Sequence, residues 1–170
     1  MKARKILHFV FAAITIAIYV FLIIESAMDG GNSSAQSQGF TAFLINVIRA
    51  IDSNSPLLSD LDVFHAVTRK LFGHFLAFGG AGIFTALSLL MLEKPFRLKT
   101  IIIALAMGLS LAFITEGLQL IIPGRAGQFT DVLIDFSGFI LFAGLIYLVI
   151  YLVFKNIDKK KGQKDVSALG

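Results

Sequence analysis

Long apolar stretches separated by short polar ones dominate the chain. Four of them reach the length of about 20 residues that a helix needs to cross the hydrocarbon core of a bilayer. They cover residues 6–24, 71–92, 100–122 and 132–154. Each is longer than a helix buried in a water-soluble protein usually is. The pattern predicts an all-α polytopic membrane protein, in which residues 1–154 form one domain of four transmembrane helices.

The first stretch follows a basic N-terminus, as the apolar region of a secretory signal peptide also does. That region spans only about 7 to 15 residues, whereas residues 6–24 form a longer run. The residues after it, Glu25, Ser26 and Ala27, make a poor cleavage site. We therefore expect a first helix that is not cleaved from the protein.

Two different patterns occupy the connection between the first and second spans. Residues 28–39 are rich in Gly, Ser, Asn and Gln, which predicts a flexible loop. Residues 40–52 repeat apolar side chains at helical spacing, with Thr41, Arg49 and other polar side chains on the opposite side. This amphipathic helix is too short to span the bilayer. It is expected either to lie in the membrane interface or to fold over the bundle as a lid.

A further helix start is predicted just before the second span. Pro56 marks a turn, and Ser59 with Asp62 three residues later resembles a capping box. The helix that starts here is expected to continue into the second span. It would carry Arg69, Lys70 and His74 in consecutive turns at the outer end of that span.

Composition and charge agree with the membrane assignment and add an orientation. The chain is 56% hydrophobic with a mean hydropathy of +0.83, against roughly 45–50% apolar residues in soluble domains. Eleven of its fifteen Lys and Arg residues precede the first span, lie between the second and third, or follow the fourth. The positive-inside rule then places both termini in the cytoplasm, with residues 155–170 as a basic cytoplasmic tail. The basic residues need no nucleic-acid partner to explain them, and no cysteine is present for a disulfide or a thiolate metal site.

Ionisable and amide side chains interrupt the apolar pattern at one predicted depth, near the outer ends of the second, third and fourth spans. The candidate site residues are Arg69, Lys70, His74, Glu116, Gln119, Arg125, Asp131 and Asp135. Asp131 and Asp135 share one face of their helix, as Glu116 and Gln119 do of theirs. We expect these residues to form an outward-facing polar pocket, with Arg125 folded back over the carboxylates.

Small side chains predict which way these spans face. Ala104, Gly108, Ala112 and Glu116 recur every four residues along the third span. Gly73, Ala77, Ala81 and Thr85 form a matching stripe on the second. Stripes of small residues allow membrane helices to approach closely, so Glu116 is expected to face the interior of the bundle. A charge at the centre of a membrane helix costs about 2.5 to 3.5 kcal/mol, which favours a partner for it.

Simpler explanations exist for several of these residues. Asp131, after Thr130 as a plausible N-cap, is favoured by the helix dipole alone. Arg69 and Lys70 are long enough to extend to the headgroups, and His74 is compatible with a purely packing role. Glu116 is compatible with a structural ion pair, for example with Arg125.

Two segments resemble a known family, the VanZ-like membrane proteins. "EGLQLIIPGRAGQFTDVLIDFSG" (residues 116–138) is similar to that family's signature of a Glu, a Gln, a Gly-Arg loop and an Asp-Val-Leu-Ile-Asp run. "RKLFGHFLAFGGAG" (residues 69–82) resembles its second motif. The resemblance, which covers most of residues 33–144, implies a protein of the bacterial plasma membrane. The family's namesake is associated with teicoplanin resistance by a route that does not remake the peptidoglycan precursor.

Three functions are compatible with these features. The first is a non-enzymatic envelope protein that modulates glycopeptide or lipoglycopeptide resistance by binding a lipoglycopeptide or a lipid-linked cell-wall molecule. The second is a membrane enzyme acting on a lipid-linked phosphate, with Arg69 or Arg125 holding the phosphate. The third is a small transporter, which would need an oligomer. No cofactor or metal site is predicted, because no His-Glu-x-x-His motif occurs and His74, Glu116, Asp131 and Asp135 are dispersed in the sequence.

Overall fold

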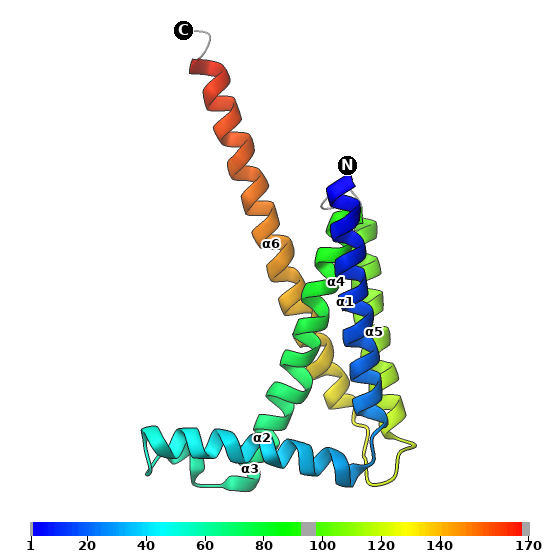
Figure 1. Ribbon diagram of the computed structural model, residues 1–170, viewed down its shortest axis with the longest axis vertical. Coiled ribbons are helices and arrows are strands. Elements are labelled where there is room, and N and C mark those ends of the chain that lie inside the picture. The colour runs from blue at the N-terminus through cyan, green and yellow to red at the C-terminus, as the bar shows by residue number, and fades with distance from the viewer. Residues whose placement is uncertain (1, 93–97, 168–170) are drawn as a thin grey trace.

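Four long helices form a bundle, and a fifth lies across one end of it (Figure 1). The computed structural model describes residues 2–92 and 98–167, with side chains described as far as residue 157. No strand occurs in these ranges, which confirms the all-α prediction. Lys94 and Arg97, two of the residues used to predict the orientation, lie outside the described residues.

The predicted four transmembrane helices are confirmed by the length and hydropathy of the helices observed. Helices long and apolar enough to cross a membrane are Lys2–Ala27, Leu61–Leu92, Leu98–Gln119 and Phe129–Ile157. The first span is α1 (Lys2–Ala27), the third is α5 (Leu98–Gln119), and the fourth is the first part of α6 (Phe129–Ser167). The second span is one continuous helix made of α3 (Leu61–Thr68), η2 (Arg69–Leu76) and α4 (Ala77–Leu92). The protein is therefore a membrane protein surrounded by lipid.

The flexible loop predicted for residues 28–39 is wrong, because helix α2 (Gly30–Ile51) includes most of it. Asp29 caps this helix by accepting a hydrogen bond from the backbone N–H of Asn32 at 3.0 Å. The backbone N–H of Gly30 also donates to the carbonyl of Pro123 at 3.1 Å. These contacts compensate for the low helix propensity of the Gly- and Ser-rich sequence.

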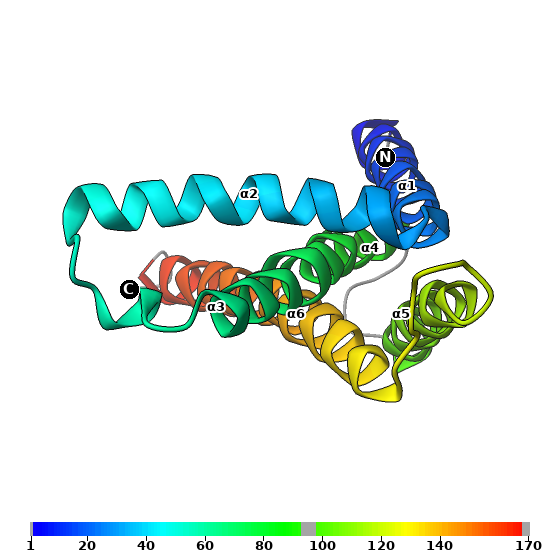
Figure 2. The ribbon, with the colours of Figure 1, turned by 90° about the horizontal axis from the view of Figure 1, so that it is seen from below.

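Helix α2 lies across the end of the bundle where α1 ends and α6 begins, which we call the α2 end (Figures 1 and 2). The short 3₁₀ turn η1 (Pro56–Leu58) then leads back to α3. Thr41, predicted on the polar side of α2, is its one buried residue. The large apolar side chains Phe43, Val47 and Ile51 remain exposed. Helix α2 therefore covers the bundle with a partly polar face and leaves apolar side chains on its surface.

The second span differs from its prediction in its cap and in its helical geometry. Asp60, and not Ser59, caps α3, because its carboxylate accepts hydrogen bonds from the N–H groups of Asp62 and Val63. The helix then continues without a break through η2, which is a π-helix. A π-helix has hydrogen bonds from i to i+5 and therefore more residues per turn than an α-helix, which changes the side that each later side chain faces. As a result the predicted stripe is only partly correct: Gly73 is exposed, whereas His74 is buried.

The turn between the third and fourth spans begins earlier than predicted. Helix α5 ends at Gln119, three residues before the expected Ile122. Pro123, which disfavours helical geometry in the residue before it, lies in the turn that follows. Gly124 adopts a positive φ of 72°, which glycine tolerates at low cost. Helix α6 begins at Phe129, before Thr130, so the predicted Thr130 cap is also wrong.

Helix α4 occupies the centre of the bundle, between α1 and α6 (Figure 2). Small residues allow the close approach, and Phe139 of α6 fills the space that they leave. A Cβ built on Gly82 would lie 2.4 Å from the carbonyl oxygen of Phe139, and one on Gly108 would lie 2.5 Å from the ring of Phe139. The buried Ala104, Gly108, Ala112 and Glu116 agree with the stripe predicted for the third span.

Replacing Gly82 with alanine tests this close packing. The added methyl group would collide with the backbone of α6, which cannot move aside as a side chain can, so Gly82→Ala should destabilise the protein by about 1–3 kcal/mol. Gly80→Ala is the matched control in the same helix, because nothing lies within 4 Å of its Cβ position. The control should be neutral or stabilising by up to about 1 kcal/mol. Thermal unfolding in detergent measures both, and equal melting temperatures would contradict the packing.

Candidate functional site

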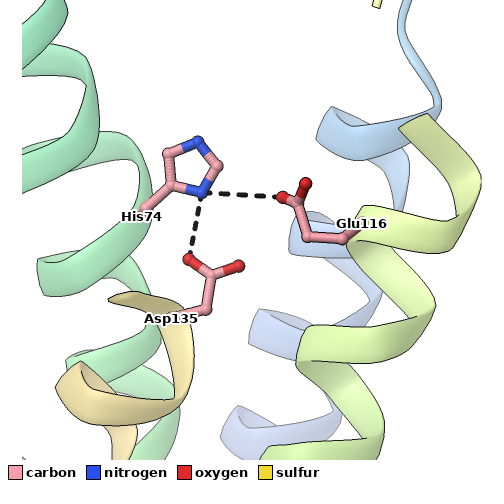
Figure 3. A group of neighbouring side chains, drawn as sticks. All are labelled: His74, Glu116 and Asp135. Atoms are coloured by element: carbon pink, nitrogen blue, oxygen red, sulfur yellow. Dashed lines mark hydrogen bonds and ion pairs between the residues drawn. The ribbon is translucent and has the colours of Figure 1, made fainter. Parts of the chain in front are cut away.

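His74, Glu116 and Asp135 converge from three different helices at the α2 end of the bundle (Figure 3). His74 Nδ1 lies 3.0 Å from Asp135 Oδ1 and 3.8 Å from Glu116 Oε1. All three residues are buried, and Asp135 has an exposed fraction of 0%. We call these three residues the buried triad. They were predicted at a common depth, and the structure adds that they are in direct contact.

The π-helical segment η2 determines which basic residues lie beside the triad. Arg69 and His74 are five residues apart, and the wider turn of the π-helix brings them closer to one side of the helix than a regular α-helix would. Both side chains line the same cavity. In a regular α-helix the two side chains would point about 140° apart.

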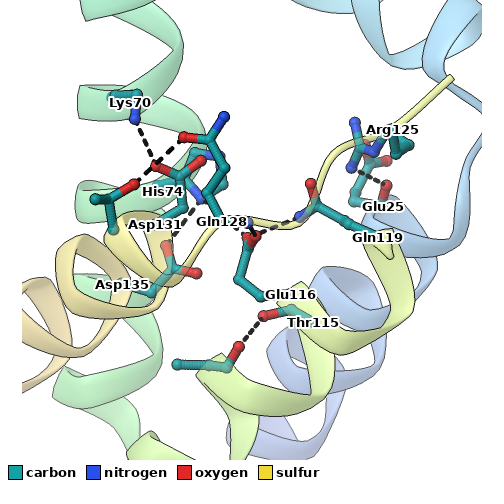
Figure 4. Close-up of polar contacts among 12 residues, drawn as sticks. Glu25, Lys70, His74, Thr115, Glu116, Gln119, Arg125, Gln128, Asp131 and Asp135 are labelled. Carbon is teal, nitrogen blue, oxygen red and sulfur yellow. Dashed lines mark hydrogen bonds and ion pairs between the residues drawn. The ribbon is translucent and has the colours of Figure 1, made fainter. Parts of the chain in front are cut away.

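Hydrogen bonds from two other residues hold Glu116 in place (Figure 4). Gln119 Nε2, one turn later on α5, donates to Glu116 Oε1 at 2.8 Å. The backbone N–H of Gln128, in the loop before α6, donates to Glu116 Oε2 at 3.0 Å. Gly127 makes this loop possible, because a Cβ there would lie 2.3 Å from the carbonyl oxygen of Glu116. Glu116 therefore fastens the loop to α5.

Asp131 and Lys70 form a separate ion pair beside the triad. Lys70 Nζ donates to Asp131 Oδ1 at 2.5 Å, and the Lys70 side chain is 43% exposed. An ion pair this accessible contributes about 1 kcal/mol or less. Although Asp131 and Asp135 share a helix face as predicted, they have different partners, since Asp135 contacts His74.

Arg125 does not fold over the carboxylates as predicted. Its guanidinium donates to the hydroxyl of Ser33 on α2 and, at 3.2 Å, to the backbone carbonyl of Glu25 at the end of α1. Burial lowers the pKa of the Arg125 guanidinium from its usual value, and the nearby charge of Arg69 acts in the same direction. Arg125 therefore joins three parts of the chain: α1, α2 and the loop after α5.

A cavity of about 360 Å³ lies between the triad and helix α2. Its polar lining includes the triad, Gln119, Arg69 and Arg125. Its apolar lining includes Phe21, Leu22, Phe40, Phe72 and Phe78. Ser33 and Ser37 of α2 close the side opposite the bundle. Lys70 and Asp131 line a second, neighbouring cavity, which shares Arg69, His74 and Arg125 with the first.

Sequence reasoning missed three contributors to this region. Ser33 was part of a predicted loop, Glu25 contributes only a backbone carbonyl to Arg125, and Gln128 contributes a backbone N–H. Backbone groups carry no sequence signal. The helical N-cap Asp29, four residues before Ser33, was the one local signal that α2 starts early.

A comparison with protein families covers nearly the whole chain. A model of the VanZ/LLP1 family matches residues 3–152. The chain belongs to the VanZ/LLP1 family. The matched range of the VanZ/LLP1 model includes the triad, Arg125 and all of α2. Comparisons with curated proteins and with solved structures gave no match.

The chemistry available at this site of the VanZ/LLP1 protein is that of carboxylates, an imidazole and guanidinium groups. Paired carboxylates and an imidazole exchange protons and bind cations. Guanidinium groups bind carboxylates and phosphates. Because apolar walls adjoin these groups, the cavity has the mixed lining that an amphiphilic molecule requires.

Arg125→Ala tests the connection between α1, α2 and the loop. Losing the hydrogen bonds to Ser33 and to the Glu25 carbonyl should cost roughly 1 kcal/mol, because the side chain is only partly buried, and should speed amide hydrogen exchange about fivefold. The effect is expected in the first two turns of α2. Arg49→Ala, which removes an exposed arginine near the other end of α2, is the control. Unchanged exchange in Arg125→Ala would contradict an anchoring role.

Proposed function

We propose that this VanZ/LLP1 protein resides in the bacterial plasma membrane and binds an amphiphilic anionic molecule of the cell envelope in the cavity beside the triad. Binding there would modulate the action of glycopeptide or lipoglycopeptide compounds. The observation that carries the proposal is the juxtaposition of apolar walls and charged groups in one cavity of about 360 Å³. Candidate ligands are a lipid-linked cell-wall molecule and a lipoglycopeptide.

The apolar side of the cavity supports an acyl or isoprenoid chain as one part of the ligand. Phe21 and Leu22 of α1 and Phe40 of α2 contribute to it, together with Phe72 and Phe78 of the second span. Phe40 and Phe72 pack edge to face with ring centroids 5.1 Å apart. Helix α2 is thus a wall of the cavity as well as its cover.

The charged side supports an anionic headgroup. Arg69 and Arg125 both line the cavity, close enough that the charge of one lowers the pKa of the other, Arg125. Two neighbouring guanidinium groups favour a bound anion, and Arg pairs suit the planar geometry of carboxylate and phosphate. The buried triad lies beside them and would contact polar groups of the same headgroup.

The proposal includes an orientation in which the α2 end faces outward. The chain contains no cysteine, so single cysteines can be introduced without background. Gln128→Cys, in the exposed loop before α6, should react with a membrane-impermeant maleimide on intact cells. Lys5→Cys, exposed at the opposite end of the bundle, should react only after permeabilisation. The reverse pattern would reject this orientation.

Expression in a susceptible Gram-positive host tests the resistance role. We expect the wild-type protein to raise the inhibitory concentration of teicoplanin and Glu116→Gln to return it to the level of cells without the protein. Asp62→Asn makes the same change of charge at an exposed position outside the cavity and should retain the effect. Expression levels must be matched by immunoblot. If the wild-type protein leaves susceptibility unchanged, the resistance role is wrong.

An enzyme acting on a lipid-linked phosphate is the second candidate. The 3.0 Å contact between His74 Nδ1 and Asp135 favours it, because a carboxylate that orients an imidazole is a frequent arrangement in general acid–base catalysis. Release of phosphate or of the headgroup from a labelled lipid phosphate by the purified protein would distinguish this candidate from binding alone.

A further inference from the structure

No lysine or arginine forms an ion pair with Glu116 or Asp135 among the contacts of the described residues. Lys70 is paired with Asp131, and Arg125 is directed to Ser33 and to a backbone carbonyl. With both carboxylates ionised, the triad has a net charge of −2 when His74 is neutral and −1 when it is protonated. Buried carboxylates that are not compensated are costly, so this site requires bound protons or a cation.

One carboxylate oxygen of the triad is left without a partner. Asp135 Oδ2 is buried and has no hydrogen bond, although Asp135 Oδ1 contacts His74. The Asp135 side chain is only 1% exposed. Figure 3 shows this second oxygen directed toward the side of Glu116. It is therefore aimed into the space between the two carboxylates, where a cation would be bound.

The spacing of the triad suits a single metal ion. In a tetrahedral zinc site with bonds of about 2.1 Å, neighbouring ligand atoms lie about 3.4 Å apart. The two distances from His74 Nδ1, 3.0 Å to Asp135 Oδ1 and 3.8 Å to Glu116 Oε1, lie on either side of that value. Ligand atoms of all three residues lie within 4.8 Å of one another. Small side-chain adjustments would bring them to coordination distance around one ion.

We propose that His74, Glu116 and Asp135 bind one divalent transition-metal ion of the Zn²⁺ or Mn²⁺ class. One imidazole nitrogen with two carboxylate oxygens is a donor set for such borderline ions, and it neutralises the two buried negative charges. Gln119 and the backbone of Gln128 already orient Glu116, as groups surrounding a metal ligand do. No metal site was predicted from the sequence, because the three residues are far apart along the chain and come from three separate helices.

The ion would have access to the cavity, since all three ligands line it. Three protein ligands leave at least one coordination position for water or a ligand oxygen, as in catalytic zinc sites. Helix α2 and Arg125 lie on the other side of this space. The metal site does not depend on the proposed resistance role, because the ligand set is complete within the bundle.

Metal uptake by the purified full-length protein tests the proposal. The protein in detergent is treated with a chelator, equilibrated with Zn²⁺ or Mn²⁺ in the presence of excess Mg²⁺, and analysed by inductively coupled plasma mass spectrometry. We expect one Zn²⁺ or Mn²⁺ per chain for the wild type and for Asp131→Asn, the matched control whose carboxylate pairs with Lys70. Asp135→Asn and Glu116→Gln should lower the affinity by roughly a hundredfold or more.

A thermal shift distinguishes loss of the site from loss of the fold. Zn²⁺ or Mn²⁺ should raise the melting temperature of the wild type and of Asp131→Asn but not of Asp135→Asn. Without metal, Asp135→Asn should melt no lower than the wild type, because it removes a buried charge while keeping the side-chain shape. Failure of the wild type to bind either ion, or equal binding by Asp135→Asn, would overturn the proposal in favour of protons shared within the triad. Metal uptake is measured on purified protein without antibiotic, so its outcome is separate from the effect of the wild-type protein on teicoplanin susceptibility.

Discussion

Ionisable groups inside a membrane-spanning bundle must be hydrogen-bonded or paired, and this constraint organises the α2 end of the protein. Glu116 receives hydrogen bonds from Gln119 and from the loop before α6, while Asp135 contacts His74 across helices. The same polar groups hold the three spans in register. Because these groups come from η2, α5, α6 and the loop before α6, the complete polar cluster can form only when the bundle is assembled.

Close helix packing provides the frame for that cluster. Glycines on α4 and α5 let Phe139 of α6 lie between them, and Gly138 brings α6 against the backbone of Phe75. Asp135 lies one turn before Phe139 on the same helix face, so the packing that buries the phenylalanine also buries the carboxylate. Apolar side chains alone would position the helices less precisely, because lipid tails are equally apolar and no hydrophobic driving force brings the helices together.

The sequence was sufficient to predict the features that depend on periodicity. The four spans follow from length and hydropathy, and the inward face of Glu116 follows from Ala104, Gly108 and Ala112 at intervals of four. Features that depend on tertiary contacts could not be predicted. Helix α2 starts in a Gly- and Ser-rich segment, where the N–H of Gly30 donates to the carbonyl of Pro123. Arg125 donates to the Ser33 hydroxyl and the Glu25 carbonyl, and not to the carboxylates. The π-helical segment likewise has no simple sequence signal, so its effect on the directions of Arg69 and His74 was not predicted.

The π-helical segment makes the number of residues, as well as their identity, part of the site. It accommodates more residues per turn than an α-helix, and the surplus is taken up between Arg69 and Leu76. Deleting one residue between Arg69 and His74 would allow a regular α-helix in which the two residues are four apart and stay on one side. Converting the segment to a regular α-helix at its present length would instead place the two side chains about 140° apart. The residue count of this segment and its π-helical geometry are therefore matched, and a change in one without the other would separate Arg69 from the buried carboxylates.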